Sequence, residues 1–172
     1  MLVFHDLPKK IPPYVQFHNY AAAYLDSAEI LCLQIQQRKD AGYAYGAVVL
    51  SLAFHSLELF FKGSILRMAP FENFSGSSGH DLDQLSRRFF NLYPAKEFQF
   101  EVPFGMSEAG PNRASQDNEL NRIPADQAHR YPTGADGQPW KALFSFDPEK
   151  FLLSLNELKD VYIRLRPLMS ST

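Results

Sequence analysis

The chain of 172 residues has a single cysteine, Cys32, so it can form neither an intramolecular disulfide nor a cysteine-rich zinc site. It also lacks an excess of charge of either sign, because 17 Lys and Arg stand against 19 Asp and Glu. A protein that grips duplex DNA or an anionic membrane over its whole surface carries a strong positive excess. We therefore expect no duplex DNA partner, although a local basic patch stays compatible with these numbers.

Other absences concern targeting signals and common catalytic motifs. The first ten residues lack the basic-then-apolar order of a secretion signal, and the uninterrupted apolar runs are far shorter than the ~20 residues of a membrane span. We therefore expect a cytoplasmic protein with no membrane partner. The sequence has no internal repeat, no Walker loop, no His-Glu-x-x-His and no Gly-x-Ser-x-Gly. The five histidines show no metal-ligand spacing, so we expect neither a metal nor a cofactor.

The composition is that of an ordinary globular domain, with 45% hydrophobic and 21% charged residues, and the length fits a single domain over residues 1–172. Four segments show the three-or-four-residue apolar spacing that is typical of helices. Prolines are expected to stop the last three helices, and Asp147 is expected to cap the fourth. The segments are about residues 14–40, 43–68, 81–92 and 147–166, and the stopping prolines are Pro70, Pro94 and Pro167.

A long irregular insertion, about residues 95–146, separates the third and fourth helices. Its start alternates polar residues with Phe98, Phe100, Val102 and Phe104, which predicts a short strand. The turn at residues 134–137 is compatible with a small β-hairpin within the insertion. We therefore predict an all-α fold, an antiparallel bundle of four to five helices that carries this insertion before its last helix.

The second helix is apolar on almost every side, which is typical of a helix packed by neighbours on most faces. Its exceptions are Ser51, His55, Glu58 and Lys62, which fall within an arc of roughly 60° at 100° per residue. Glu58 and Lys62 are four residues apart with the acid first, the favourable order for an ion pair within a helix. The helix therefore carries one polar stripe.

Two stretches of the sequence resemble the HEPN family (higher eukaryotes and prokaryotes nucleotide-binding). Residues 53–63 read Ala-Phe-His-Ser-Leu-Glu-Leu-Phe-Phe-Lys-Gly, and residues 79–85 read Gly-His-Asp-Leu-Asp-Gln-Leu. Many members carry a Glu and a Lys one turn apart on one helix and a His-Asp-Leu opening to the next. Residues 130–132, Arg-Tyr-Pro ahead of a Gly-rich turn, are also similar to a segment of some members.

The resemblance implies a four-to-five-helix bundle that is usually a homodimer. Members include non-catalytic RNA- or nucleotide-associated modules, partners of minimal nucleotidyltransferases, and metal-independent endoribonucleases. We expect a non-catalytic module that binds a nucleotide or RNA. The alternatives are an endoribonuclease of the toxin or defence type, and an interaction partner or scaffold in a two-protein system, for which a nucleotidyltransferase is one candidate partner.

The candidate binding residues lie around the Glu58–Lys62 pair. In the functional interpretation they form a polar pocket for a phosphate or a base, with Lys62 and Arg130 as cationic contacts. In the structural interpretation the same charges fix the third helix and the insertion against the second helix, because structural networks also gather charges in this way. The complete candidate set is Ser51, His55, Glu58, Lys62, His80, Asp81 and Arg130.

The endoribonuclease alternative depends on Arg122 and His129. Nuclease members of the family carry an Arg, then four to six residues, then a His, and the spacing here fits. The Arg would stabilise charge on the phosphate, and the His would move the proton of the 2′-hydroxyl. Pro124 and Pro132 bracket the stretch and favour a loop, where the family has the start of a helix, and Ile123 stands where a polar residue often follows.

A small basic group, Arg87, Arg88 and Lys96, lies close in sequence to several aromatic residues. The aromatic residues are expected to fill the core and a dimer interface. For the basic group we expect a weak, salt-sensitive contact with RNA.

Overall fold

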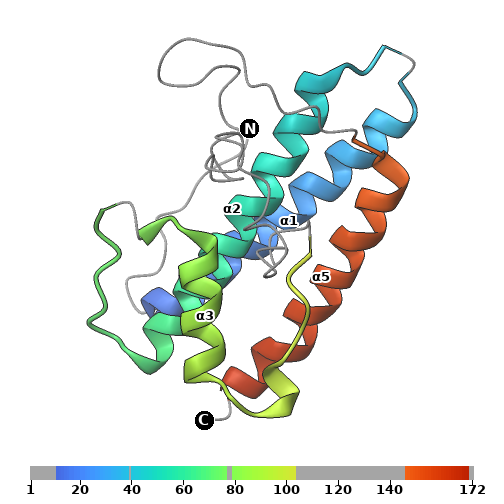
Figure 1. Cartoon of the computed structure of the whole chain (residues 1–172). Helices are drawn as coiled ribbons and strands as arrows, with labels where there is room; N and C mark the ends of the chain where they lie inside the picture. The colour runs from blue at the N-terminus through green and yellow to red at the C-terminus, as the bar shows by residue number, and fades with distance from the viewer. Residues whose placement is uncertain (1–10, 39, 77–78, 104–145, 171–172) are drawn as a thin grey trace, which may run out of the picture.

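The computed structural model describes residues 11–38, 40–76, 79–103 and 146–170 (Figure 1). Over these residues the chain forms α-helices and short 3₁₀ turns, with no β-strand, so the predicted all-α helical bundle is confirmed. The elements are α1 (Pro13–Gln36), α2 (Tyr43–Met68), α3 (Leu82–Leu92), the 3₁₀ helix η2 (Lys96–Phe98) and α5 (Pro148–Ser170).

Helix α2 lies at the centre of the bundle, with α1 and α5 on one side and α3 on the other (Figure 1). Helix α1 is antiparallel to α2, because Ala21 contacts Ser56 while the earlier His18 contacts the later Ser64. It is antiparallel to α5 as well, since Glu29 contacts Lys159 and the earlier Asn19 contacts Arg166.

Helix α3 runs in the same direction as α2. Glu58 contacts His80, Phe61 contacts Phe89, and Ser64 accepts a hydrogen bond from Tyr93, so the contacts advance together along both segments. The antiparallel order therefore holds for α1 against α2 and α5, while His80, just before α3, lies back beside Glu58 in the middle of α2. This return brings the start of α3 next to Glu58.

Local signals account for most helix ends. Asp81 accepts a hydrogen bond from Gln84 N at 3.1 Å, and Asp147 accepts from Glu149 N at 3.1 Å and Lys150 N at 3.3 Å. Both are the side-chain caps that satisfy the first free N–H groups of a helix. Helix α2 has its predicted bounds, whereas α1 ends at Gln36 and not at residue 40.

The prediction that Pro167 stops the last helix is wrong, because α5 continues through it to Ser170. A proline removes one backbone N–H, which costs the helix the hydrogen bond to the carbonyl of Ile163. Leu165 and Met169 lie on either side of Pro167 and are almost completely buried. Burying both side chains requires the helix to continue, and this packing outweighs the lost hydrogen bond.

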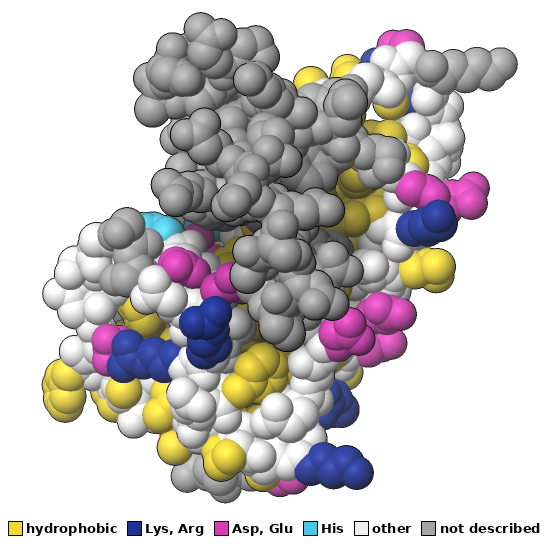
Figure 2. Space-filling view, in the orientation of Figure 1, with side chains coloured by type: hydrophobic (Ala, Val, Ile, Leu, Met, Phe, Trp, Pro, Cys, Tyr) yellow, Lys and Arg dark blue, Asp and Glu magenta, His cyan; other side chains and the backbone are white. Residues whose placement is uncertain are grey.

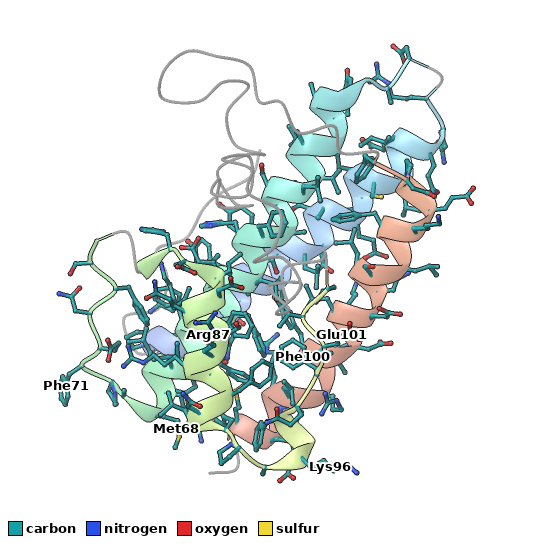
Figure 3. The ribbon with its side chains drawn as sticks, viewed as in Figure 1. Met68, Phe71, Arg87, Lys96, Phe100 and Glu101 are labelled. Atoms are coloured by element: carbon teal, nitrogen blue, oxygen red, sulfur yellow. The ribbon has the colours of Figure 1, made fainter. Side chains whose placement is uncertain are left out.

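The prediction of a strand starting at Phe98 is wrong for the residues that the structure describes. Phe98 belongs to η2, and residues 99–103 have no regular structure. The ring of Phe100 packs near those of Phe60, Phe61 and Phe89, and Figure 3 shows it between α3 and α5. The rings are therefore held by the helical core and not by a sheet. Phe104 and the predicted hairpin lie outside the described residues.

Helix α2 is long and apolar enough, from Ala44 to Met68, to cross a membrane by length and composition alone. Half of its most apolar window is buried inside the protein. The core helix of a soluble bundle has the same composition, so the cytoplasmic location stays a prediction. The central side chains Leu57, Phe60 and Phe61 are completely buried, and Phe60 stacks on Tyr162 with 4.2 Å between ring centroids.

Candidate functional site

The polar stripe of α2 is organised around the carboxylate of Glu58. One oxygen, Oε1, accepts a hydrogen bond from Lys62 Nζ at 2.7 Å and lies 2.9 Å from His80 Nδ1. The other, Oε2, lies 3.6 Å from His55 Nδ1. His55, Glu58 and Lys62 come from successive turns of α2, and His80 comes from the segment just before α3. The two stretches that resemble the HEPN family therefore meet at this carboxylate.

The ion pair at the centre of this cluster is buried. The side chains of Glu58 and Lys62 are 3% and 7% exposed, and Lys62 Nζ lies 5.4 Å from the ring centroid of Phe74. Charges removed from water in this way are tolerated only when each has a partner. Lys62 therefore pairs with Glu58 and lies over the face of Phe74, and it presents little surface to a ligand.

The pKa of Glu58 shows whether burial or the neighbouring side chains have the larger effect on the carboxyl group. Burial by itself raises the pKa, but the nearby His55 imidazole and the hydrogen bond and charge of Lys62 outweigh burial and lower the pKa to about 2. We assign the larger share to Lys62, because its 2.7 Å contact is a full hydrogen bond while 3.6 Å is long for one. The carboxylate is therefore ionised at neutral pH.

The two imidazoles are the parts of the cluster that reach the surface. The side chain of His80 is 55% exposed and that of His55 is 33% exposed. His55 packs edge-on against Tyr24, with 4.5 Å between ring centroids. Since Nδ1 of each ring faces Glu58, Nε2 is the ring nitrogen left for a ligand.

The remaining predicted site residues are Asp81 and Ser51, which the structure describes, and three residues of the insertion. Asp81 uses both carboxylate oxygens on Gln84, at 3.1 and 2.8 Å, and so serves as the cap of α3. Ser51 is half-buried on the same face of α2, two turns before Glu58. Arg130, Arg122 and His129 lie in the segment 104–145, outside the described residues, and their roles stay predictions.

The described residues contain no group of three His, Cys, Asp or Glu side chains placed to hold a metal ion. The predicted basic group is not one patch. Both terminal guanidinium nitrogens of Arg88 donate to Glu72, and Figure 3 shows Lys96 at the bottom of the view, past the end of α3 and apart from Arg87. In Figure 2 the blue side chains on this face are scattered and acidic side chains lie among them. This surface therefore gives little support to RNA contact.

Sequence reasoning missed a second buried polar group, which joins α1, α2 and the end of α3. His18 Nε2 lies 3.1 Å from Ser64 Oγ, Ser64 Oγ donates to the Phe60 carbonyl at 2.8 Å, and Tyr93 donates to the Ser64 carbonyl at 2.9 Å. Because the hydroxyl hydrogen goes to Phe60, His18 is the donor to Ser64. The only sequence signal was that His18 falls on the buried stripe of α1.

Sequence reasoning also missed a groove of about 430 Å³ between α1 and α5. Its walls are mainly apolar, and Asp26, Lys159 and Arg166 line it as well. Lys159 is held there by Asp26 at 2.9 Å and Glu29 at 2.8 Å. These residues come from distant parts of the chain, so no sequence spacing points to the groove.

Comparisons of the chain with protein-family models, curated proteins and solved structures found no match. The features that bear on function are therefore the geometry around Glu58 and the residues that resemble the HEPN family.

Proposed function

We propose that the chain is a HEPN-like helical module that binds RNA or a nucleotide where His80 and His55 reach the surface. The observation that supports the proposal is the meeting of the two family-like stretches at Glu58, which holds His80 at 2.9 Å. A buried carboxylate orients this imidazole while more than half of its side chain stays exposed. An oriented and accessible polar group is what a binding site requires.

The charge of the cluster suits a phosphate. Lys62 already balances Glu58, so each imidazole that gains a proton adds net positive charge at the surface. A protonated imidazole donates a charge-assisted hydrogen bond to a phosphate oxygen. In this proposal Lys62 positions Glu58 and does not touch the ligand, since its side chain is only 7% exposed.

Binding is tested with a fluorescently labelled, single-stranded, 2′-O-methylated oligoribonucleotide followed by anisotropy. We expect His80→Ala to weaken binding about tenfold, which corresponds to about 1.4 kcal/mol. Asn91→Ala, a change at an exposed position of α3, is the matched control and keeps the affinity of the wild type. Equal affinities for wild type and His80→Ala, or an affinity that does not fall between low and moderate salt, would contradict the proposal.

A separate observation favours an interaction surface on the α1–α2 pair. Tyr20, Tyr24 and Leu31 share one side of α1, and Val48 and Leu52 share one side of α2, counting 100° per residue. The Tyr24–His55 contact places these two sides next to each other.

We call these five residues, together with Leu59, the hairpin face. None of the six carries a charge, and Tyr20 and Val48 are about half exposed. Interface cores are depleted of charge and rich in aromatic residues. We propose that a second copy of the chain covers this face, because its six residues carry no charge that would repel their counterparts in the copy. His55 lies within the face beside Tyr24, so in such a dimer His80 is the imidazole that stays open to a ligand. A different protein, such as a nucleotidyltransferase, is the alternative occupant.

A further inference from the structure

We propose that the groove between α1 and α5 binds a small apolar carboxylate that carries an N–H donor beside its charge, the chemistry of an N-acylated apolar amino acid. The groove is separate from the proposed RNA site, because His80 contacts Glu58 on α2. It is also separate from the hairpin face, since Asp26 in the groove and Tyr24 in the face point about 160° apart on α1 at 100° per residue. The inference therefore goes beyond the proposed function and does not depend on it.

The groove has a fixed apolar floor and an exposed apolar wall. Leu25 and Tyr162 form the floor and are 1% and 3% exposed. Tyr162 is held in place, because its ring stacks on Phe60 at 4.2 Å and its hydroxyl oxygen lies 3.0 Å from Ser56 Oγ. Ile163 forms the wall and is 64% exposed. The volume of about 430 Å³ falls in the range of small-molecule sites, about 300–1,000 Å³.

The groove also contains a backbone acceptor that lacks its helical donor. In an uninterrupted helix the carbonyl of Ile163 accepts from the N–H of the residue four positions later, but that residue is Pro167, which has no N–H. Residues four apart lie on the same side of a helix, and both of these residues line the groove. The carbonyl therefore lies on the groove side of α5. A ligand that covers it without offering a donor loses binding free energy, so the ligand should carry an N–H.

The charged residues of the lining favour an anionic group at one end of the groove. Lys159 contacts Asp26 at 2.9 Å and Glu29 at 2.8 Å, so acids balance its charge at that end. At the opposite end Arg166 donates to Oδ1 of Asn19, a neutral acceptor, at 2.8 Å. A guanidinium has five N–H donors in a planar fork, so it can bind a carboxylate while it keeps its contact with Asn19.

These features together define the class of ligand. An apolar group packs on Leu25 and Tyr162, an N–H donates to the carbonyl of Ile163, and a carboxylate accepts from Arg166. The last two groups lie within one turn of α5, so the N–H and the carboxylate must be neighbours in the ligand. An N-acylated apolar amino acid has this arrangement, whereas a fatty acid lacks the donor. The C-terminal residue of a peptide carries the same groups, and the experiment compares these two sources.

The test is an NMR titration of the full chain with N-acetyl-L-phenylalanine and two analogues of the same shape. In one analogue an ester oxygen replaces the N–H, and in the other a carboxamide replaces the carboxylate. We expect each analogue to bind at least about fivefold more weakly, because each leaves one polar group of the groove without its partner. The shifted resonances are expected on α1 and α5.

Two variants test which groups recognise the ligand. Pro167→Ala restores the N–H that the helix lacks, so the carbonyl of Ile163 gains an internal donor. This variant should fold at least as stably as the wild type and bind the parent compound as weakly as its ester. Arg166→Met should remove the preference for carboxylate over carboxamide. Arg87→Met, a change at an exposed position of α3, is the matched control and should keep all three affinities.

Absence of binding, or equal binding of the three compounds by the wild type, overturns the proposal. A Pro167→Ala variant that still prefers the N–H compound to its ester also overturns it, since the preference then does not come from the carbonyl of Ile163. A short peptide that ends in phenylalanine separates the two sources. Tighter binding of the peptide than of the N-acetylated amino acid supports a peptide C-terminus as the ligand, and equal or weaker binding supports the small acid.

Discussion

Replacing Glu58 or Lys62 is expected to have a large energetic consequence, because both side chains are charged and nearly inaccessible to water. Their attraction offsets the cost of removing two ions from water, but neither residue is tolerable without the other. The Glu58–Lys62 pair is required in both interpretations of the cluster, as a ligand site and as a structural network. Its contribution to stability therefore has to be measured separately from function.

Replacing Lys62 alone should destabilise the fold strongly. We expect Lys62→Met to lower the free energy of unfolding by about 3–5 kcal/mol, because it leaves the Glu58 carboxylate buried without its cation. The double variant Glu58→Leu with Lys62→Met should lose less than the sum of the two single losses. Urea unfolding at pH 7 provides the values. Lys159→Met, which breaks an ion pair of similar length at an exposed site, is the control and should lose little. Additive losses in the double variant would contradict the buried pair.

His18 makes stability depend on pH. Burial and the nearby charge of Arg166 lower its pKa from 6.5 to about 4, so the folded state favours the neutral ring. The unfolded chain binds more protons between these values, and stability is therefore complete above pH 6.5 and falls as the pH drops toward 4. The full shift corresponds to a loss of about 3 kcal/mol.

The measurement is chemical unfolding of wild type and His18→Gln at several pH values between 7 and 5. The variant cannot titrate at position 18, so its stability should fall less steeply with decreasing pH. Parallel curves for the two proteins would show that His18 is not the titrating group.

At the scale of elements, the close approach of α1 and α2 depends on Gly63. A Cβ at this position would lie 2.7 Å from Cδ2 of His18 and 3.0 Å from Cβ of Phe17. Alanine is otherwise favoured over glycine in a helix by about 1 kcal/mol. The sign of the change in stability caused by Gly63→Ala therefore shows whether helix propensity or packing dominates.

We expect Gly63→Ala to destabilise the protein by about 1–3 kcal/mol, because His18 is only 5% exposed and has no room to move away. Thermal or urea unfolding measures the change. Gly42→Ala is the control, since its added Cβ meets nothing within 4 Å, and it should change stability by less than about 1 kcal/mol. A more stable Gly63→Ala variant would mean that the two helices do not approach this closely.

Local chemistry predicted the existence of the helices and most of their ends, and it failed where distant contacts decide. Asp81, Asp147 and Pro148 act within one turn of the residues that carry them, so their effect can be interpreted from sequence. The continuation of α5 past Pro167 depends on burial of Leu165 and Met169 against other helices. No sequence window contains those partners.

At the scale of the whole molecule, the hairpin face makes a prediction about assembly. We expect the wild type to be a dimer at micromolar concentration, measured by size-exclusion chromatography with light scattering. Val48→Asp should give a folded monomer, because it places a charge in an apolar interface. Ile163→Asp, a similar change at an exposed position of α5, should leave the dimer intact. A monomeric wild type, or a Val48→Asp variant that stays dimeric, would remove the second copy as the occupant of the face.

Some features of the candidate site follow from local sequence, and others depend on tertiary packing. The spacing of residues along the chain is enough to predict that α2 is a core helix with one polar stripe, and that Glu58 and Lys62 lie one turn apart on it. These features follow from the helical period, which acts between neighbours in the chain. The all-α fold followed from the same periodicity in four segments.

The packing of the helices determines which charges are buried and which polar groups stay accessible to a ligand. The parallel course of α3 brings His80 to Glu58, and the packing around Lys62 removes that side chain from the surface. The pairing of His18 with Ser64 arose in the same way. Each of these contacts joins residues far apart in the chain, and their distances depend on how whole helices pack against one another.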